Sequence, residues 1–220
     1  MIVNGFWYGS ELGELEKLCI DSWIKNGYEF YLWLYDDIEV SKDVIVKDAN
    51  DIISIDQYFT YNEGHTKGLP QAFSCLFRAK LLYRFGGLWS DLDELCLKPY
   101  NFNKRFVFSE QVDSGWEWHV NTNIIFSQNK GESIFDDWSD RILSKKNGTI
   151  THGDLGPNLF TKLVIHHNLE EYVLPKEYFS PVDWESYKDI FEFNSDEAYG
   201  LHLYHSIWDE EDYKNIDRLR

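Results

Sequence analysis

The chain has 220 residues, enough to bury one substantial core, and no Pro-, Gly- or Ser-rich linker divides it, so the sequence predicts a single domain over residues 1–220. Its formal net charge of -17 argues against binding to the phosphate backbone of a nucleic acid and against docking on anionic lipid. Three cysteines without CxxC spacing, and no apolar run near the ~20 residues of a membrane span, favour a reduced, cytoplasmic protein without a membrane span.

Strand-like and helical patterns alternate in the first part of the chain. Ser10 is the expected N-cap of the first helix, and Gly27 is the expected residue just past its end. A strand, helix, strand order with short connections implies parallel strands in an α/β sheet. The expected elements are a strand at 2–8, a helix at 11–26, and strands at 28–35 and 44–46.

A helix predicted at residues 71–85 leads into the most informative segment of the chain. Two glycines at 86 and 87 end this helix, and a short apolar strand then leads to Asp91 and Asp93. On a strand, the side chains of Asp91 and Asp93 would project to one face, while Leu92 would turn into the core. Two carboxylates suit Mn²⁺ or Mg²⁺ that keeps positions open for substrate phosphates. The sequence therefore predicts that the chain handles a nucleoside diphosphate or a similar ligand.

The second half of the chain continues the alternation. An α/β fold with a mixed, mostly parallel sheet flanked by helices is therefore expected, and ligands bind such sheets at the carboxyl ends of strands, where the acidic pair is placed. The expected elements are strands at 105–110 and 122–127, helices at 133–146 and 155–167, and a late strand at 199–204.

The segment from Phe73 to Asp93, with Arg78 in its helix and the run GGLWSDLD at its end, resembles the DXD-containing glycosyltransferases of the GT-A fold. That group includes sugar-transferring bacterial toxins and α-1,4-glycosyltransferase-like enzymes. Weaker similarity spans most of the remaining chain. It covers residues 6–9, which resemble the opening strand, residues 156–157 at a later helix start, and residues 202–208, which resemble a closing motif beside the metal.

The resemblance implies a Rossmann-like sheet and a metal-dependent transfer of a sugar from a nucleoside diphosphate sugar, favouring UDP, to a hydroxyl of a glycan. It implies that Asp93 binds Mn²⁺ or Mg²⁺ directly, that Asp91 reaches the ribose and a metal-bound water, and that His202, or failing it His205, completes the metal site. Arg78 would reach the donor sugar. The donor nucleotide would contact Trp7, which lies against the uracil, and further Tyr8, Arg78, Asp91 and Leu92.

Other interpretations of the same residues remain open from the sequence. Arg78 could pair with an acidic residue on the sheet surface, and Trp7 could be a core side chain. The family commonly has Asp where this chain has Cys75. A thiol does not accept hydrogen bonds from sugar hydroxyls as a carboxylate does. Cys75 therefore favours a deoxy sugar or a different binding pose of the donor, and the enzyme class expected is a hexosyl- or deoxyhexosyl-transferase. Trp116, Trp118 and Trp184 suit ordinary packing, or stacking on an acceptor sugar.

Stereochemistry and the acceptor are not specified by the sequence. An inverting enzyme needs a carboxylate base on the acceptor side, for which Glu110, Asp113 and Asp154 are candidates, whereas a retaining enzyme does not. The resemblance favours retention. Asn121 and Asn123 could bind an acceptor hydroxyl, or could simply form a turn. Two other functions fit the same features: a nucleotide-sugar hydrolase or pyrophosphatase, and a non-catalytic carbohydrate-binding module. Partner domains outside these residues are also compatible with the sequence.

Overall fold

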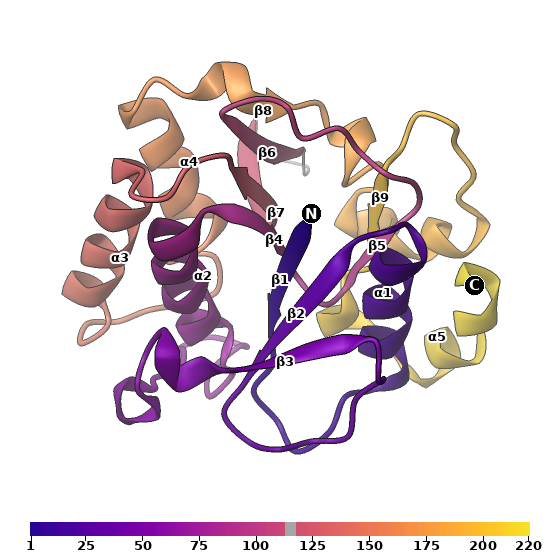
Figure 1. Cartoon of the computed structure of the whole chain (residues 1–220), viewed down its shortest axis with the longest axis horizontal. Helices are drawn as coiled ribbons and strands as arrows, with labels where there is room; N and C mark the ends of the chain where they lie inside the picture. The colour runs from indigo at the N-terminus through magenta and orange to yellow at the C-terminus, as the bar shows by residue number, and fades with distance from the viewer. Residues whose placement is uncertain (113–117) are drawn as a thin grey trace.

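A seven-stranded sheet forms the centre of the protein, in a computed structural model that describes residues 1–112 and 118–220 (Figure 1). The pairs β4–β7 and β6–β7 are antiparallel and the other neighbouring pairs are parallel, which confirms the predicted mixed, mostly parallel sheet. The strand order is β3 (Val44–Asp48), β2 (Glu29–Leu34), β1 (Ile2–Phe6), β4 (Gly87–Ser90), β7 (His119–Ser127), β6 (Phe106–Gln111) and β8 (Val173–Leu174).

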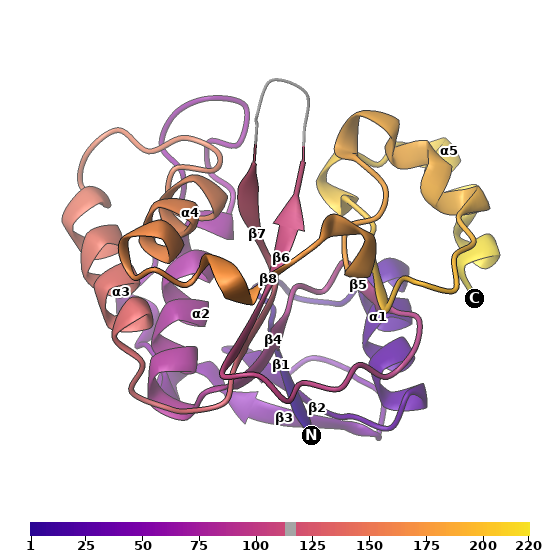
Figure 2. The same ribbon diagram turned by 90° about the horizontal axis from the view of Figure 1, so that it is seen from above.

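Helices cover both faces of this sheet. Seen from above, α2 (Gln71–Phe85), α3 (Ser133–Lys145) and α4 (Pro157–His166) lie on one side, and α1 (Glu14–Lys25) and α5 (Glu210–Lys214) lie on the other (Figure 2). Large side chains such as Phe77, Trp138 and Phe160 fill the first interface, and Val3, Trp23 and Leu88 belong to the second. Burying these rings and aliphatic groups away from water supplies most of the favourable free energy of folding.

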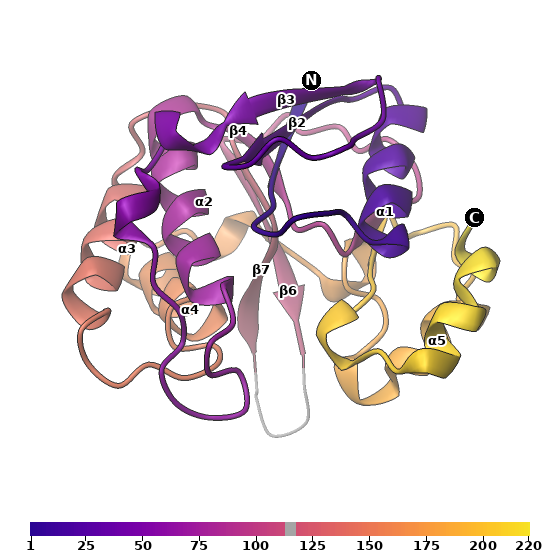
Figure 3. The ribbon, with the colours of Figure 1, turned by 90° about the horizontal axis from the view of Figure 1, so that it is seen from below.

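A second, two-stranded sheet lies beside the acidic pair. Its strands are β5 (Glu94–Cys96) and β9 (Gly200–His202), which run antiparallel with Glu94 opposite His202. The view from below shows the late part of the chain, in yellow, on the same side as α1 (Figure 3). The small sheet therefore brings residues near 200 next to the residues that follow β4.

The connection from α2 into β4 depends on glycine. The helix has the bounds predicted from the sequence, and it ends at Gly86, whose φ of 65° lies in the left-handed region. A Cβ atom at Gly86 would lie 2.8 Å from the carbonyl oxygen of Asn129. Only glycine combines this backbone conformation with so close a backbone neighbour. The chain can therefore enter β4 directly, alongside β1.

The structure also differs from the predicted elements in specific places. The first helix begins at Glu14 with Gly13 as its N-cap, so the N-cap predicted at Ser10 was wrong. Strands β5 and β8 were not predicted, and the late strand is limited to Gly200–His202. These strands have two or three residues, too few to show an alternating pattern. Among the described residues, no helix is long and apolar enough to cross a membrane.

Candidate functional site

The acidic pair lies in a tight turn between β4 and β5. Strand β4 ends at Ser90, the backbone N–H of Asp91 donates to the carbonyl of Asn123 on β7 at 2.8 Å, and the N–H of Glu94 donates to the carbonyl of Asp91 at 3.3 Å. The expectation that Asp91 and Asp93 extend a strand was therefore wrong. The turn lies at the carboxyl end of β4, the edge where α/β sheets bind ligands.

Asp91 is held by side chains from β4 and from α2. The guanidinium of Arg78 is 3.0 Å from one carboxylate oxygen of Asp91, and the indole N–H of Trp89 donates to the same oxygen at 2.9 Å. Arg78 is 5% exposed, also donates to the carbonyl of Thr122, and lies 4.9 Å from the centre of the Trp89 ring. Arg78 therefore pairs with an acid of the DXD motif itself, and its contact with the donor sugar stays a prediction.

Asp93 is held instead by the late part of the chain. The carbonyl of Asp93 accepts from the backbone N–H of Leu203 at 2.8 Å. Its Oδ2 atom accepts from the backbone N–H of His205 at 3.2 Å and lies 3.5 Å from Nε2 of His202. Within the described residues, Oδ1 of Asp93 has no hydrogen-bond donor or ion-pair partner. Asp93 therefore keeps one oxygen available to a ligand.

The two carboxylates have different electrostatic surroundings. Burial raises the pKa of Asp91, against the lowering effect of Arg78, and the neighbouring charge of Asp93 raises it further. Burial acts in the same direction on Asp93, but the charge and hydrogen bond of His202, with the contacts from His205, lower the pKa of Asp93 to about 2. Asp93 is therefore the carboxylate that stays ionised throughout the neutral range.

The imidazole of His202 is oriented by Asn121. The amide oxygen of Asn121 accepts from the backbone N–H groups of Thr122 at 2.7 Å and of Asn123 at 3.3 Å, so its amide nitrogen faces Nδ1 of His202 at 3.3 Å. In this arrangement Nδ1 accepts and the ring presents Nε2–H to Asp93. To bind a metal through Nε2, the ring would carry its proton on Nδ1, and Asn121 would turn its oxygen toward it.

The second histidine predicted for the metal site faces another part of the molecule. Nδ1 of His205 lies 2.7 Å from the carboxylate of Glu16 on α1, and Nε2 contacts the hydroxyl of Tyr213 on α5. Burial lowers the pKa of His205, but the hydrogen bond and charge of Glu16 prevail and raise it. The structure thus brings the backbone of His205, and not its ring, to Asp93.

The predicted nucleotide-contacting residues are distributed over both faces of the sheet. Leu92 is buried and packs where β1 has Gly5, because a Cβ atom there would be 2.6 Å from a Leu92 methyl group. Trp7 packs on the α1 side, and its indole N–H has no acceptor within the described residues. Tyr8 is exposed and stacks on Tyr58 with ring centres 4.5 Å apart. The indole N–H of Trp7 is thus a buried donor without an acceptor among the described residues.

Cys75 lies on α2 one turn before Arg78. It is 4% exposed, its thiol is hydrogen-bonded to Tyr61, and a Cβ atom at Gly156 would lie 3.3 Å from the sulfur. Burial raises the pKa of Cys75 to about 11, so the group is a neutral thiol at neutral pH. The position where the family commonly has a carboxylate is therefore small, uncharged and closely packed here.

The two candidate bases that the structure describes, Glu110 and Asp154, make their hydrogen bonds to groups outside the acidic turn. Glu110 and Trp118 line a cavity of about 570 Å³ together with Ile165, Glu170, Val173 and Pro175, and Glu110 accepts from the backbone N–H of Lys176 at 3.2 Å. Asp154 accepts hydrogen bonds from the backbone and hydroxyl of Thr151. Asp113 and Trp116 lie outside the described residues, and Trp184 is exposed.

A buried polar group behind the turn was not found from the sequence. The carboxylate of Glu94 is fully buried and accepts from the amide of Asn123 at 2.8 Å, and the same amide donates to Ser180 at 3.2 Å. Burial raises the pKa of Glu94 well above its usual range. The signal in the sequence was two asparagines inside an otherwise apolar strand, which were interpreted as acceptor-binding or turn residues. Both residues lie within β7, so the turn interpretation was wrong; Asn121 contacts His202 and the carbonyl of Asn123 accepts from Asp91, and binding of an acceptor hydroxyl stays a prediction.

The chemistry of the site fits a divalent cation. Among the described residues, no three His, Cys, Asp or Glu side chains are already grouped as a metal site. The turn nevertheless offers an ionised carboxylate with a free oxygen at Asp93, a second carboxylate at Asp91 and an imidazole at His202, a donor set typical of Mn²⁺ or Mg²⁺ bound together with substrate phosphates. The residues present therefore fit the metal that the sequence predicts.

Comparison with protein families agrees with this geometry. Residues 13–113 match the family described as "Glycosyltransferase sugar-binding region containing DXD motif". The match runs from the N-cap of α1 through α2, β4 and the acidic turn to the end of β6. No curated protein matches the chain.

Solved structures show the fold. The structure titled "PaToxG Glycosyltransferase" is 16% identical, with a TM-score of 0.51 over 76% of this chain and 69% of that chain. The galactosyltransferase LgtC, solved with donor and acceptor sugar analogues, is 9% identical, with a TM-score of 0.51 over 100% of this chain and 95% of that chain. These matches confirm the predicted GT-A architecture.

Proposed function

We propose that this chain transfers a sugar from a nucleoside diphosphate sugar, UDP-linked in the first instance, to a hydroxyl of a glycan. The proposal is supported by the match of residues 13–113 to the family of DXD-containing sugar-binding regions of glycosyltransferases. The observation that supports it most is the turn at the carboxyl end of β4, where Asp91 and Asp93 are held in place by two separate sets of contacts. We also propose that residues 1–220 act as a single domain, because the small sheet links the late part of the chain to the acidic turn.

In this proposal, Asp93, Asp91 and His202 hold Mn²⁺ or Mg²⁺. When bound, the metal neutralises the charge that develops on the leaving diphosphate. Arg78 favours the ionised form of Asp91 and fixes its position, and its buried guanidinium adds positive charge on the donor side of the turn. Oδ1 of Asp93 has no partner in the described structure, so it is the oxygen that would bind the cation.

The nucleotide would lie along the end of β1. Trp7 has a buried indole N–H without an acceptor among the described residues, and the ring of the next residue, Tyr8, is exposed on the other face of the sheet; these are the two side chains proposed to contact the base or the ribose. The side chain of Leu92 is buried, so its contribution to nucleotide binding is limited to its backbone. The neutral, confined thiol of Cys75 leaves a hexose and a deoxyhexose as candidate donor sugars.

The first experiment measures the melting temperature with a panel of nucleoside diphosphates and nucleotide sugars, each with Mn²⁺ and with EDTA. A ligand at a hundredfold excess over its Kd stabilises the folded protein by about 2.7 kcal/mol, which moves a melting curve visibly. We expect one nucleotide to raise the melting temperature only with Mn²⁺, and Asp93→Ala to abolish the shift. Asp137→Ala is the matched control, because Asp137 lies on α3 in a partly exposed ion pair with Arg141.

Assays of donor hydrolysis and of glycan binding distinguish the two alternative functions. Release of free sugar or sugar phosphate without an acceptor would favour a nucleotide-sugar hydrolase or pyrophosphatase. Binding of glycans that is insensitive to EDTA and to Asp93→Ala would favour a carbohydrate-binding module. If none of the nucleotides changes the melting temperature, with or without Mn²⁺, the transferase proposal is contradicted.

A further inference from the structure

A buried carboxylate on α1 contacts the segment that holds Asp93. Glu16 is 2% exposed, and its Oε1 atom lies 2.7 Å from Nδ1 of His205. Its other oxygen has no hydrogen-bond partner within the described residues. Taking a carboxylate out of water is unfavourable unless it is paired, and pairs of this kind are often no more stable than apolar side chains of similar volume. The presence of an acidic residue at this buried position therefore indicates a role other than stabilising the fold.

The backbone geometry after β9 shows what this contact positions. Tyr204 has a φ of 53°, in the left-handed region, so the chain reverses sharply between His202 and His205. The reversal returns the backbone N–H of His205 to Oδ2 of Asp93, at 3.2 Å, while its imidazole extends toward α1. The two ends of one residue thus contact Asp93 and Glu16.

The imidazole of His205 is the point of attachment for this segment. Glu16 on α1 binds one ring nitrogen, and the hydroxyl of Tyr213 on α5 contacts the other. A non-glycine residue in the left-handed region costs of the order of 1 kcal/mol or more and persists only where its surroundings hold it. The contacts of the His205 ring supply such a restraint, together with the bond from the Tyr204 hydroxyl to the carbonyl of Val182 at 2.7 Å.

We propose that Glu16 is a positioning residue for the donor and metal site, acting through His205 to hold the N–H group that orients Asp93. This inference rests on the proposed function, because it assigns Glu16 a role in the binding step of that same site. Through the Glu16–His205 pair, the position of Asp93 depends on α1. Asp91, in contrast, is positioned by Arg78 and Trp89 and not by the Glu16–His205 pair.

The experiment compares Glu16→Leu with Glu16→Gln in the full chain. Leucine fills the space without an acceptor, whereas the amide oxygen of glutamine still accepts from Nδ1 of His205. We expect Glu16→Leu to weaken binding of Mn²⁺ with UDP about tenfold by calorimetry, the loss equivalent to one hydrogen bond to a charged group. Glu16→Gln should restore the affinity to within about threefold of the starting protein.

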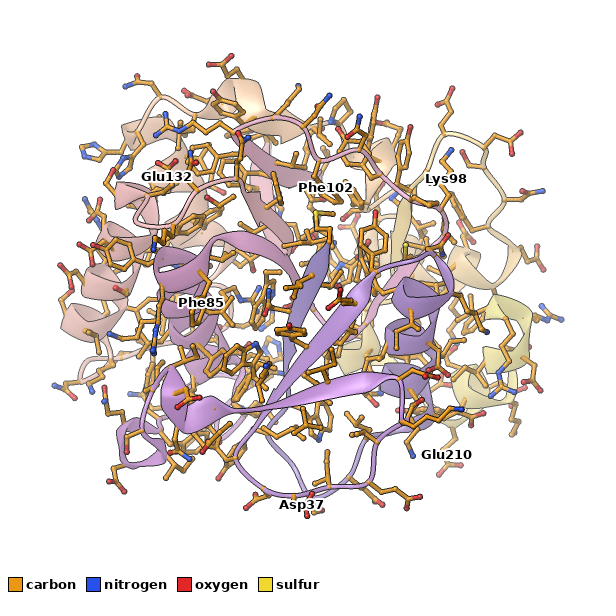
Figure 4. All side chains as sticks on the ribbon, viewed as in Figure 1. Asp37, Phe85, Lys98, Phe102, Glu132 and Glu210 are labelled. Carbon is orange, nitrogen blue, oxygen red and sulfur yellow. The ribbon has the colours of Figure 1, made fainter. Side chains whose placement is uncertain are left out.

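Hydrogen exchange of residues 200–208, followed by mass spectrometry without ligand, is the second measurement. We expect faster exchange in Glu16→Leu, and near-normal exchange in Glu16→Gln. Glu132→Leu is the matched control, because Glu132 is a similarly buried carboxylate, bound to Arg105 at 2.6 Å, and Figure 4 shows it beside α3, across the sheet from α1. This control should change the melting temperature without changing Mn²⁺ and UDP affinity or exchange at 200–208.

The outcomes separate this inference from the proposed function. Unchanged affinity in Glu16→Leu, with the starting protein binding Mn²⁺ and UDP normally, would overturn the role of Glu16 alone. Unchanged exchange at 200–208 would also overturn it. A starting protein that binds no nucleotide with Mn²⁺ would contradict the proposed function and, with it, the positioning role. Equal affinity losses in Glu16→Leu and Glu132→Leu would show a general effect of stability and would likewise overturn the inference.

Discussion

Arg78 shows why the residue type matters at the centre of the site. Its guanidinium contacts three partners at once: the carboxylate of Asp91, the carbonyl of Thr122 and the hydroxyl of Ser74. A planar group with five donors can satisfy these acceptors together and lie over the ring of Trp89, whereas an ammonium is a single point charge. Arg78 therefore links α2, β7 and the acidic turn in one buried network.

Replacement of Arg78 by lysine should lower both stability and donor turnover. Lysine keeps the positive charge but cannot reach Asp91 and Thr122 together, so we expect a loss of about 2 kcal/mol in the free energy of unfolding. Urea denaturation measures this loss, and a sugar-transfer assay measures the turnover. Arg141→Lys, in the partly exposed pair with Asp137, is the control and should change stability by less than ~0.5 kcal/mol. Equal effects of the two substitutions would contradict the buried network.

The pKa of Cys75 gives a prediction about pH. Its folded-state pKa of about 11 lies above the ~8.5 of an unfolded thiol. Burial of the neutral thiol therefore contributes its full stability below about pH 8.5, and this contribution falls as the pH rises toward 11. At pH 8 we expect iodoacetamide to label Cys75 at least about 100-fold more slowly in the folded protein than in urea, as measured by peptide mass spectrometry. Rapid labelling of the folded protein would show an accessible thiolate instead.

Charged residues that form a short local motif were predictable, and those whose contacts join distant parts of the chain were less so. The sequence predicted Asp91 and Asp93 as a pair because they are two residues apart. It did not predict that Glu16 meets His205, or that Asn121 meets His202, because these contacts join residues far apart in the chain. A signal for Glu16 was present: Cys19, Ile20 and Trp23, at helical spacing from it, are all buried, so the acid lies on the apolar face of α1.

At the scale of elements, long periodic segments were predictable and short ones were not. Helix α2 and the glycines after it follow from local sequence, since fifteen residues give a clear pattern and a φ above zero calls for glycine. The strand expected to carry both acids ended earlier, because the turn into β5 depends on pairing with β9, which lies more than a hundred residues later. Tertiary pairing of that kind leaves no local pattern.

The glycine at the end of α2 can be tested against a second helix end. Gly86 and Gly27 both have positive φ, but a Cβ atom at Gly86 would lie 2.8 Å from a backbone oxygen, whereas none of the described atoms lies within 4 Å of one at Gly27. We expect Gly27→Ala to cost about 1 kcal/mol for backbone strain, and Gly86→Ala to cost at least about 2 kcal/mol more. Chemical denaturation of both variants measures the difference. Equal costs would show that the backbone around Asn129 moves freely.

At the scale of the whole molecule, burial of the core stabilises the folded state and the excess of negative charge destabilises it. Two layers of helices bury aromatic and aliphatic side chains on the two faces of one sheet, which was predictable in outline from the alternation of elements. The acidic residues outnumber the basic ones by 38 to 21, giving a net charge of -17 that the described ion pairs offset only locally. Repulsion among like charges destabilises a compact state.

Salt should therefore stabilise this protein. Raising the NaCl concentration from about 10 mM to about 150 mM shortens the screening length from roughly 30 Å to 8 Å, and we expect the free energy of unfolding to rise by about 1 kcal/mol. Urea denaturation at pH 7.5 in both buffers measures this change. The same comparison near the isoelectric point of about 4.7 is the control, where the effect should shrink. Destabilisation by salt at pH 7.5 would mean that attractive ion pairs outweigh the repulsion.

The pairing of β5 with β9 also has a consequence for the order in which the protein assembles during synthesis. The ribosome delivers Asp91 and Asp93 more than a hundred residues before Leu203 and His205, whose backbone N–H groups fix Asp93. At about 5 to 20 residues per second, the acidic turn waits several seconds for these donors. The large sheet is complete only once β8 (Val173–Leu174) has been made, so translation that stalls after residue 174 and before residue 203 would leave a nascent chain with all strands of that sheet but a loosely held Asp93. A chain released between residues 174 and 205 would lack the donors that fix Asp93, and under the proposed function it would bind Mn²⁺ or Mg²⁺ weakly.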